Sequence, residues 1–255
     1  MDEIDLAREL ADIADEISMR YFGADPFFEP KVDGTLVTVA DREIEQALRR
    51  RIESHFPEHA LVGEEEGSAG DPSAPTWVID PIDATNNYAW GIPIFATLVA
   101  LRVEGRSEIG IASAPALGER YEATRGGGAS MNSSTVTVTD VASIGEARIC
   151  YGSHAGIMHD LGNGWREVLR DCRRERGFGD FWGHVLVARG AAEVMAEPAV
   201  ALWDVAALQV IVEEAGGRIT QFNGEPHPAD WGPGYLTSLT TNGRLHDKLV
   251  QSLAG

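Results

Sequence analysis

Three groups of acidic residues, each placed where a strand should end or a helix should begin, constrain this chain most. Glu64 follows a short apolar run, Asp80 and Asp83 end the most apolar strand-like run, and Asp204 opens a helical pattern. Carboxylates that leave strand ends together converge on the crevice where α/β folds bind ligands. Their mutual repulsion is costly unless cations neutralise it. We therefore expect these four residues to form one metal site.

The ligand types indicate which metal this site would hold. Oxygen-only ligands suit hard ions such as Mg²⁺ or Mn²⁺. No histidine or cysteine is interleaved with the acids, which disfavours zinc. The two cysteines, Cys150 and Cys172, match no metal-ligand spacing and predict no disulfide framework, so we expect two buried or half-buried thiols. A single acid of this kind is more often a helix cap or a solvated charge, and only the coincidence of three groups favours a metal site.

The segment Asp-Pro-Ile-Asp-Ala-Thr at 80–85 also predicts an anion site. Pro81 stiffens the turn, and we expect Asp83 to N-cap a following helix. The backbone N–H groups of Ala84 and Thr85 would then point outward at the positive end of the helix dipole, which favours a phosphate group.

Charge and composition exclude several classes of protein. The net charge of −19 over 255 residues argues against nucleic-acid binding, which needs a basic face. A chain this acidic repels anionic ligands at long range and can bind one only where metals or arginines reverse the sign locally. No apolar run is long enough for a membrane span. The acidic, amphipathic N-terminus does not resemble a secretory signal, so we expect the cytoplasm.

The pattern of elements predicts a layered α+β or α/β protein. We expect one domain over 1–255, with a metal-loop half at about 1–140 that holds an antiparallel sheet, and an α/β half at 141–255. Apolar periodicity predicts helices at 2–22, 41–54, 164–173, 181–189, 204–215 and 245–253. Strands are expected at 60–63, 77–80, 95–103, 107–114, 120–124, 147–151, 192–196 and 218–221, the third to fifth of them as an antiparallel meander.

The chain resembles the inositol-monophosphatase superfamily of metal-dependent phosphatases. The matching segments, in order, are Val-Thr-Val-Ala-Asp at 37–41, Gly-Glu-Glu at 63–65, the segment 80–85, Trp-Asp-Val-Ala-Ala at 203–207 and Glu-Ala-Gly-Gly-Arg-Ile-Thr at 214–220. The resemblance implies a layered αβαβα sandwich of the inositol-monophosphatase/fructose-1,6-bisphosphatase type. It also implies Mg²⁺-dependent hydrolysis of a small phosphate monoester and, usually, a homodimer.

The resemblance assigns metal ligands by position. Glu64, Asp80 and the carbonyl of Ile82 would hold a first ion, and Asp80, Asp83 and Asp204 a second. Two or three Mg²⁺ ions are expected in the active site, and Mn²⁺ can substitute for them. In chemical terms this is metal-assisted in-line displacement, with Glu64 counted among the catalytic residues.

The resemblance assigns the remaining roles in the same way. Thr85, paired with Asp41, would orient and deprotonate the attacking water, and the backbone N–H groups of Ala84 and Thr85 would hold the phosphate. Lys31 lies in the lid segment. The family's Asp-Gly-Thr is Asp-Ala-Thr here, so a positive φ at Ala84 would cost roughly 1 kcal/mol or more in strain.

Within this superfamily, the chain most resembles the histidinol-phosphate phosphatase branch, which indicates a substrate. This resemblance rests on the segments 91–101, 112–120, 178–181, 186–193 and 196–198. It implies that Asp180 and Glu197 bind the ammonium and imidazole of histidinol phosphate, since carboxylates favour cations. Asp180 alternatively N-caps the predicted helix 181–189, and Trp90 stands where this branch is expected to have an arginine.

Two other functions stay open. Inositol 1-phosphate or another polyol phosphate can donate hydrogen bonds to the same carboxylates. A non-catalytic protein that binds metal or phosphate is the third reading, with the alanine at position 84 as the damaging change.

Overall fold

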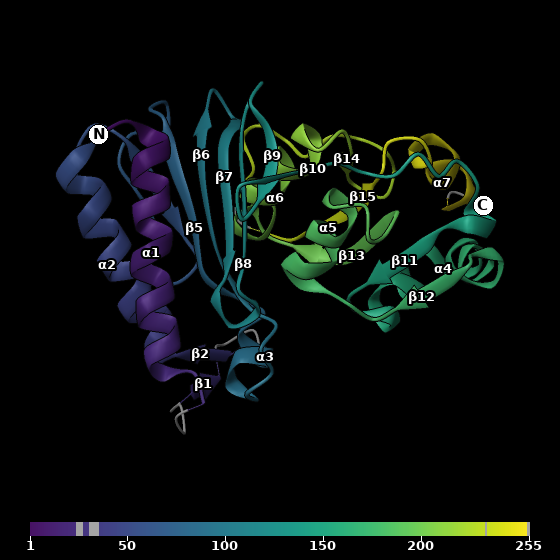
Figure 1. Cartoon of the computed structure of the whole chain (residues 1–255), viewed down its shortest axis with the longest axis horizontal. Helices are drawn as coiled ribbons and strands as arrows, with labels where there is room; N and C mark the ends of the chain where they lie inside the picture. Colours follow the sequence, from purple (N-terminus) through teal and green to yellow (C-terminus); the bar gives the residue numbers. More distant parts are fainter. Residues whose placement is uncertain (24–27, 31–35, 233, 254–255) are drawn as a thin grey trace.

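The computed structural model describes residues 1–23, 28–30, 36–232 and 234–253, and it has five layers (Figure 1). Two helices cover an eight-stranded sheet, two more lie between that sheet and a five-stranded sheet, and a last pair covers the far face. This is the αβαβα sandwich that the family resemblance implied. The helices are α1 (Glu3–Tyr21), α2 (Val39–His55), α3 (Thr85–Ala89), α4 (His154–Asp171), α5 (Asp180–Ala188), α6 (Leu202–Glu214) and α7 (His246–Leu253).

The eight-stranded sheet has the order β10-β9-β8-β7-β6-β5-β3-β4. Among the described strands of this sheet, only β3 and β5 pair in parallel. The predicted meander of β6, β7 and β8 is confirmed as antiparallel. Its strands are β3 (Ala60–Gly63), β4 (Gly67–Ala69), β5 (Thr76–Asp83), β6 (Ala96–Val103), β7 (Arg106–Ala114), β8 (Glu119–Thr124), β9 (Gly128–Met131) and β10 (Ser134–Val136).

Both faces of this sheet are buried, and the side chains of β5 alternate between two cores. Trp77 and Ile79 pack with α1 and α2, whereas Val78 packs with α5 and α6. This alternation follows from the two-residue period of a strand. It explains why the run before Asp80 reads as continuously apolar rather than as alternating.

The five-stranded sheet has the order β12-β11-β13-β15-β14. Strand β11 is parallel to β12 and β13, while β15 is antiparallel to β13 and β14. Helices α4 and α7 cover one face through Trp165 and Leu249. The strands are β11 (Arg148–Tyr151), β12 (Arg174–Arg176), β13 (Val194–Val200), β14 (Arg218–Thr220) and β15 (Leu236–Thr241), and a separate two-stranded sheet joins β1 (Phe28–Pro30) and β2 (Leu36–Thr38).

Some boundaries differ from the sequence prediction. Helix α4 begins at His154 rather than at residue 164, because the glycines there weaken the helical pattern, and Gly162 leaves the helical conformation with φ 50°. Cys150 is buried, Cys172 is half-buried and both are free thiols, as predicted. Within the described residues, no helix combines the length and apolarity that a bilayer crossing would need.

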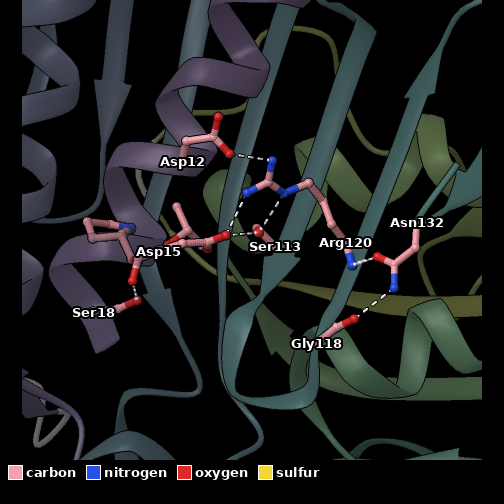
Figure 2. A network of polar contacts seen from close by, with 9 residues as sticks. Asp12, Asp15, Ser18, Ser113, Gly118, Arg120 and Asn132 are labelled. Carbon is pink, nitrogen blue, oxygen red and sulfur yellow. Dashed lines mark hydrogen bonds and ion pairs between the residues drawn. The ribbon is translucent and has the colours of Figure 1, made fainter. Parts of the chain in front are cut away.

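A polar network fastens α1 to the sheet (Figure 2). The guanidinium of Arg120, on β8, donates to the carboxylates of Asp12 (2.7 Å) and Asp15 (2.6 Å) on α1. It also donates to the Ser113 hydroxyl, which in turn donates to Asp15 at 2.9 Å. Burial raises the pKa of Asp15 even beside this arginine. The network therefore holds the outer helix layer in register with the strands.

Candidate active site

Three carboxylates meet where β5 ends and α6 begins. Asp80 and Asp83 come from the end of β5, and Asp204 comes from the first turn of α6, which packs on the same sheet. One carboxylate oxygen of each lies within 4.8 Å of the others. Asp80 and Asp83 are buried and Asp204 is half-buried, so the group is largely shielded from solvent.

The electrostatics of this cluster favour a bound cation. Burial, followed by the charges of Glu64 and Asp83, raises the pKa of Asp80 well above its usual value. Burial, followed by the charges of Asp180 and Asp204, does the same for Asp83. The buried Oδ1 of Asp80 has no hydrogen-bond partner in the described part of the chain. The residues present therefore fit a hard divalent cation, which would neutralise the charges and complete the coordination of that oxygen.

Glu64 stands just outside this group of three. It follows β3, and its backbone N–H donates to the carbonyl of Ile79 at 3.3 Å, which prolongs the parallel β3–β5 pairing. Its charge raises the pKa of Asp80 more than either of the other two cluster carboxylates does. The predicted ligand therefore belongs to the same electrostatic site, although it is not among the three carboxylates that lie within 4.8 Å.

The predicted capping role of Asp83 is wrong. Strand β5 runs through Asp83, whose Oδ2 accepts a hydrogen bond from the Phe181 N–H at 2.8 Å. Helix α3 starts at Thr85, and the residue before it, Ala84, has φ 65° and ψ 46° with no side-chain cap. The left-handed conformation at Ala84 is the strained alternative that the sequence left open.

Asp204 caps its own helix while it faces the cluster. Its Oδ2 accepts a hydrogen bond from the Ala201 N–H at 2.7 Å. Helix α6 begins at Leu202 rather than at Asp204, because the acid occupies the third position of the first turn. The same bond fixes the carboxylate at the helix entry.

Asp41 and Thr85 lie close to the cluster but do not pair with each other. The Thr85 hydroxyl donates to the carbonyl of Ile82 at 2.8 Å. The Oδ2 of Asp41 accepts from the N–H (2.8 Å) and hydroxyl (2.5 Å) of Thr38, at the start of α2. The Oδ1 of Asp41 is buried and has no hydrogen-bond partner among the described residues. The predicted Asp41–Thr85 contact is thus absent as a hydrogen bond.

The environment of Asp41 suits a group that exchanges a proton. Its pKa is raised to about 7, mainly by burial and in smaller part by the charges of Glu65 and Glu64, although the hydrogen bonds from Thr38 lower it. The predicted lid residue, Lys31, lies outside the described residues.

The two predicted substrate carboxylates line one cavity of about 520 Å³. Asp180 is the first residue of α5, and Glu197 lies on β13. Burial, then the charge of Asp180, raises the pKa of Glu197 to about 8, although the backbone amides of Asp180 and Gly152 lower it. The Oε2 of Glu197 is buried without a hydrogen-bond partner in the described part of the chain. Both carboxyl groups therefore favour a proton or a cation as neighbour.

The alternative role of Asp180 as an N-cap is wrong, because Gly179 occupies that position and Asp180 has φ 55°. Sequence reasoning also missed Gly152. A Cβ at Gly152 would lie 2.0 Å from both carboxylate oxygens of Glu197, so only glycine leaves room for that side chain. The missed signal was a glycine directly after a predicted strand.

Comparison with known proteins adds three observations. A model of the inositol monophosphatase family matches residues 1–254. Histidinol-phosphatases from Mycobacterium tuberculosis and Streptomyces coelicolor are 38% and 39% identical, over 99% and 98% of this chain and 98% and 96% of their own lengths. An IMPase structure from Thermotoga maritima matches with a TM-score of 0.88 at 29% identity, over 100% of this chain and 97% of that one.

Proposed function

Since this chain belongs to the inositol monophosphatase family of metal-dependent phosphatases, we propose that it hydrolyses histidinol phosphate to histidinol and phosphate. The observation that carries the proposal is the cavity that holds Asp180 and Glu197 beside the carboxylate cluster. The similarity to two histidinol-phosphatases over nearly their full lengths supports the same substrate.

The cavity is suited to a cationic ligand. Its two acidic residues are half-buried and their charges repel each other, and Glu197 has a buried oxygen without a partner in the described residues. The ammonium or imidazolium of histidinol phosphate would take the place of the proton that burial otherwise favours there. The phosphate would then point toward Asp83, whose pKa the charge of Asp180 raises.

The chain's own residues divide the work as follows. Glu64, Asp80, Asp83, Asp204 and the Ile82 carbonyl would hold Mg²⁺ or Mn²⁺. When bound, these ions supply activation of water and neutralisation of the phosphate charge.

Thr85 and Asp41 would orient the attacking water and take up its proton. The Oδ1 of Asp41, which is buried and has no hydrogen-bond partner among the described residues, would be the acceptor. The N–H groups of Ala84 and Thr85 would hold the phosphate. Because the carboxylates come from both halves of the sequence, we treat 1–255 as one domain, and the family favours a homodimer.

Inositol 1-phosphate is the second candidate substrate. The similarity to the Thermotoga maritima IMPase favours it, and polyol hydroxyl groups can donate to the same two carboxylates. The lower identity, 29% against 38–39%, makes it the weaker candidate.

The experiment is release of phosphate from histidinol phosphate by the purified full chain. We expect no turnover in excess EDTA and full recovery when Mg²⁺ or Mn²⁺ is added back. Thr85→Ala should abolish turnover with little change in Mn²⁺ affinity, since its hydroxyl is not a principal ligand. Full activity in excess EDTA would remove the metal site from the reaction.

A further inference from the structure

A buried ion pair on α2 faces the loop that follows β3. Glu45 is fully buried and Arg49 is nearly so. The carboxylate of Glu45 accepts two backbone hydrogen bonds from that loop, from the N–H of Glu65 at 2.8 Å and from the N–H of Glu66 at 2.9 Å. These bonds tie α2 to the two residues directly after Glu64.

Arg49 completes the same arrangement. Its Nε and Nη2 donate to Oε1 of Glu45 at 2.9 and 2.7 Å, and Nη2 also donates to the carbonyl of Gly67. The carboxylate is therefore balanced by a cation and is held by charge-assisted hydrogen bonds. The pair fixes the loop at three backbone positions, at Glu65, Glu66 and Gly67.

The end of β3 approaches the pair so closely that its last residue must be small. A Cβ at Gly63 would lie 2.2 Å from Oε1 of Glu45 and 2.8 Å from Nη2 of Arg49. Glu64 is thus flanked on both sides by contacts with this ion pair. Gly63 packs against it, and the N–H groups of Glu65 and Glu66 donate to Glu45.

We propose that Glu45, neutralised by Arg49, is a positioning residue that holds the Glu64 carboxylate toward Asp80 and so sets the metal affinity of the site. The proposal rests on the metal role proposed for Glu64. Three consecutive glutamates, 64–66, repel one another and the cluster, and anchored N–H groups oppose that repulsion. Glu45 is no ligand itself, because N–H donors occupy both of its oxygens.

The same helix carries Asp41, four residues earlier, so Asp41 and Glu45 lie on one face of α2. One rigid helix therefore sets both the proposed proton acceptor and the loop of the proposed ligand. Residues that orient metal ligands in this way typically contribute 10–100-fold to metal affinity.

The test is calorimetric titration of the substrate-free full chain with Mn²⁺. Glu45→Gln keeps the size of the side chain, but its NH₂ group cannot accept a hydrogen bond. Either the Glu65 N–H or the Glu66 N–H together with the Arg49 guanidinium therefore loses its acceptor. We expect Mn²⁺ binding weakened by roughly 10-fold or more. The kcat at saturating metal should fall much less than the affinity does.

The matched control is Glu193→Gln. Glu193 is also fully buried and also pairs with an arginine, accepting from the N–H of Arg148 at 2.6 Å and from its guanidinium at 2.5 Å, but it serves the five-stranded sheet. This variant should lose stability and keep the Mn²⁺ affinity of the unmodified chain. Arg49→Lys keeps the charge and loses the forked contact, so it should weaken Mn²⁺ binding to a smaller extent. If Glu45→Gln does not fold, this variant tests the proposal, and unchanged Mn²⁺ affinity in it would overturn the inference.

Unchanged Mn²⁺ affinity in Glu45→Gln, or an equal loss in Glu193→Gln, would overturn the inference and leave the proposed function standing. Glu64→Gln separates the two ideas. If that variant binds Mn²⁺ as tightly as the unmodified chain does, Glu64 is no ligand, and its proposed metal role fails together with the inference. If Glu64→Gln weakens binding and Glu45→Gln does not, only the inference fails.

Discussion

The carboxylate of Asp83 accepts a 2.8 Å hydrogen bond from the backbone N–H of Phe181, and this bond joins the end of β5 to the first turn of α5. Asp180, the residue before Phe181, lines the cavity that we assign to the substrate. Burial, then the charge of Asp180, raises the pKa of Asp83, and the Phe181 N–H lowers it. This hydrogen bond therefore connects the metal cluster directly to the wall of the substrate cavity.

Replacing Asp83 by asparagine should separate catalysis from folding. The amide oxygen can still accept from the Phe181 N–H, so the fold should survive, whereas the negative charge is lost from the metal site. We expect kcat to fall roughly 10²–10³-fold, equivalent to about 3–4 kcal/mol of transition-state stabilisation. Asp204→Asn should behave alike, because its oxygen can keep the cap to Ala201. Circular dichroism and steady-state rates at saturating Mg²⁺ test this, and near-normal kcat in both variants would refute the assigned roles.

The strain at Ala84 predicts a stabilising substitution. Its φ of 65° suits glycine, which adopts left-handed conformations without steric cost. Ala84→Gly should raise the free energy of unfolding by about 0.5–1 kcal/mol and should not lower kcat/KM. Urea denaturation measures the first quantity and the phosphatase assay the second.

Glu104→Gly is the matched control for that substitution. Glu104 also has a positive φ, 50°, but it lies in the turn between β6 and β7. It should gain stability without any change in activity. If Ala84→Gly destabilises the protein, the strain is not present in solution.

Much of the eight-stranded sheet and of the metal cluster could be predicted from sequence, because both depend on local patterns. Apolar strands followed by acids, and turns such as Glu104-Gly105, mark the sheet and its ends. Strand β15 was not predicted, since its run of threonines and leucines is buried on both sides and shows no alternation.

The errors at the site come from tertiary contacts. Asp83 does not cap a helix because the Phe181 N–H, distant in sequence, binds its carboxylate. Thr85 forms no hydrogen bond with Asp41, because its hydroxyl donates to the Ile82 carbonyl instead. The cavity around Glu197 depends on the glycine at 152, whose role is visible only once the strands are assembled.

The metal-free protein should lose stability as the pH rises from about 7 to about 8.5. Folding raises the pKa of Asp41 to about 7 and that of Glu197 to about 8, so the folded state holds protons that the unfolded chain has already lost. The contribution of these two groups to stability is therefore greatest below their unfolded pKa values and falls as the pH passes through the folded ones. His184 and His246 have lowered pKa values, about 3 and 4, and act in the opposite direction, mainly below pH 6.5.

Thermal unfolding in EDTA, with and without later addition of Mg²⁺, measures this effect. The Tm without metal should be lower at the higher pH, and Glu197→Gln should remove part of that fall. Mg²⁺ should raise the Tm more at the higher pH, because there the ion does not compete with protons. A flat Tm in EDTA, or an equal gain from Mg²⁺ at both pH values, would contradict the charge state inferred for the cluster.

We expect Glu197 and Asp180 to bind the positively charged part of the substrate. Glu197→Gln and Asp180→Asn each remove a charge and keep the size and hydrogen-bonding capacity of the side chain. We expect KM for histidinol phosphate to rise about 5–10-fold per site, since a charge-assisted hydrogen bond exceeds a neutral one by roughly 1 kcal/mol or more. Inositol 1-phosphate should lose much less. Glu16→Gln, on an exposed part of α1, controls for net charge and should change neither value. Equal losses for both substrates would show that the carboxylates do not recognise charge.

The most direct measurement is kcat/KM of the unmodified chain for histidinol phosphate and for inositol 1-phosphate, taken on one preparation at saturating Mg²⁺. The two esters share the phosphate, and they differ in the cationic group that Asp180 and Glu197 would bind. We predict the higher kcat/KM for histidinol phosphate. A higher kcat/KM for inositol 1-phosphate would contradict the assignment and make this chain an inositol phosphatase.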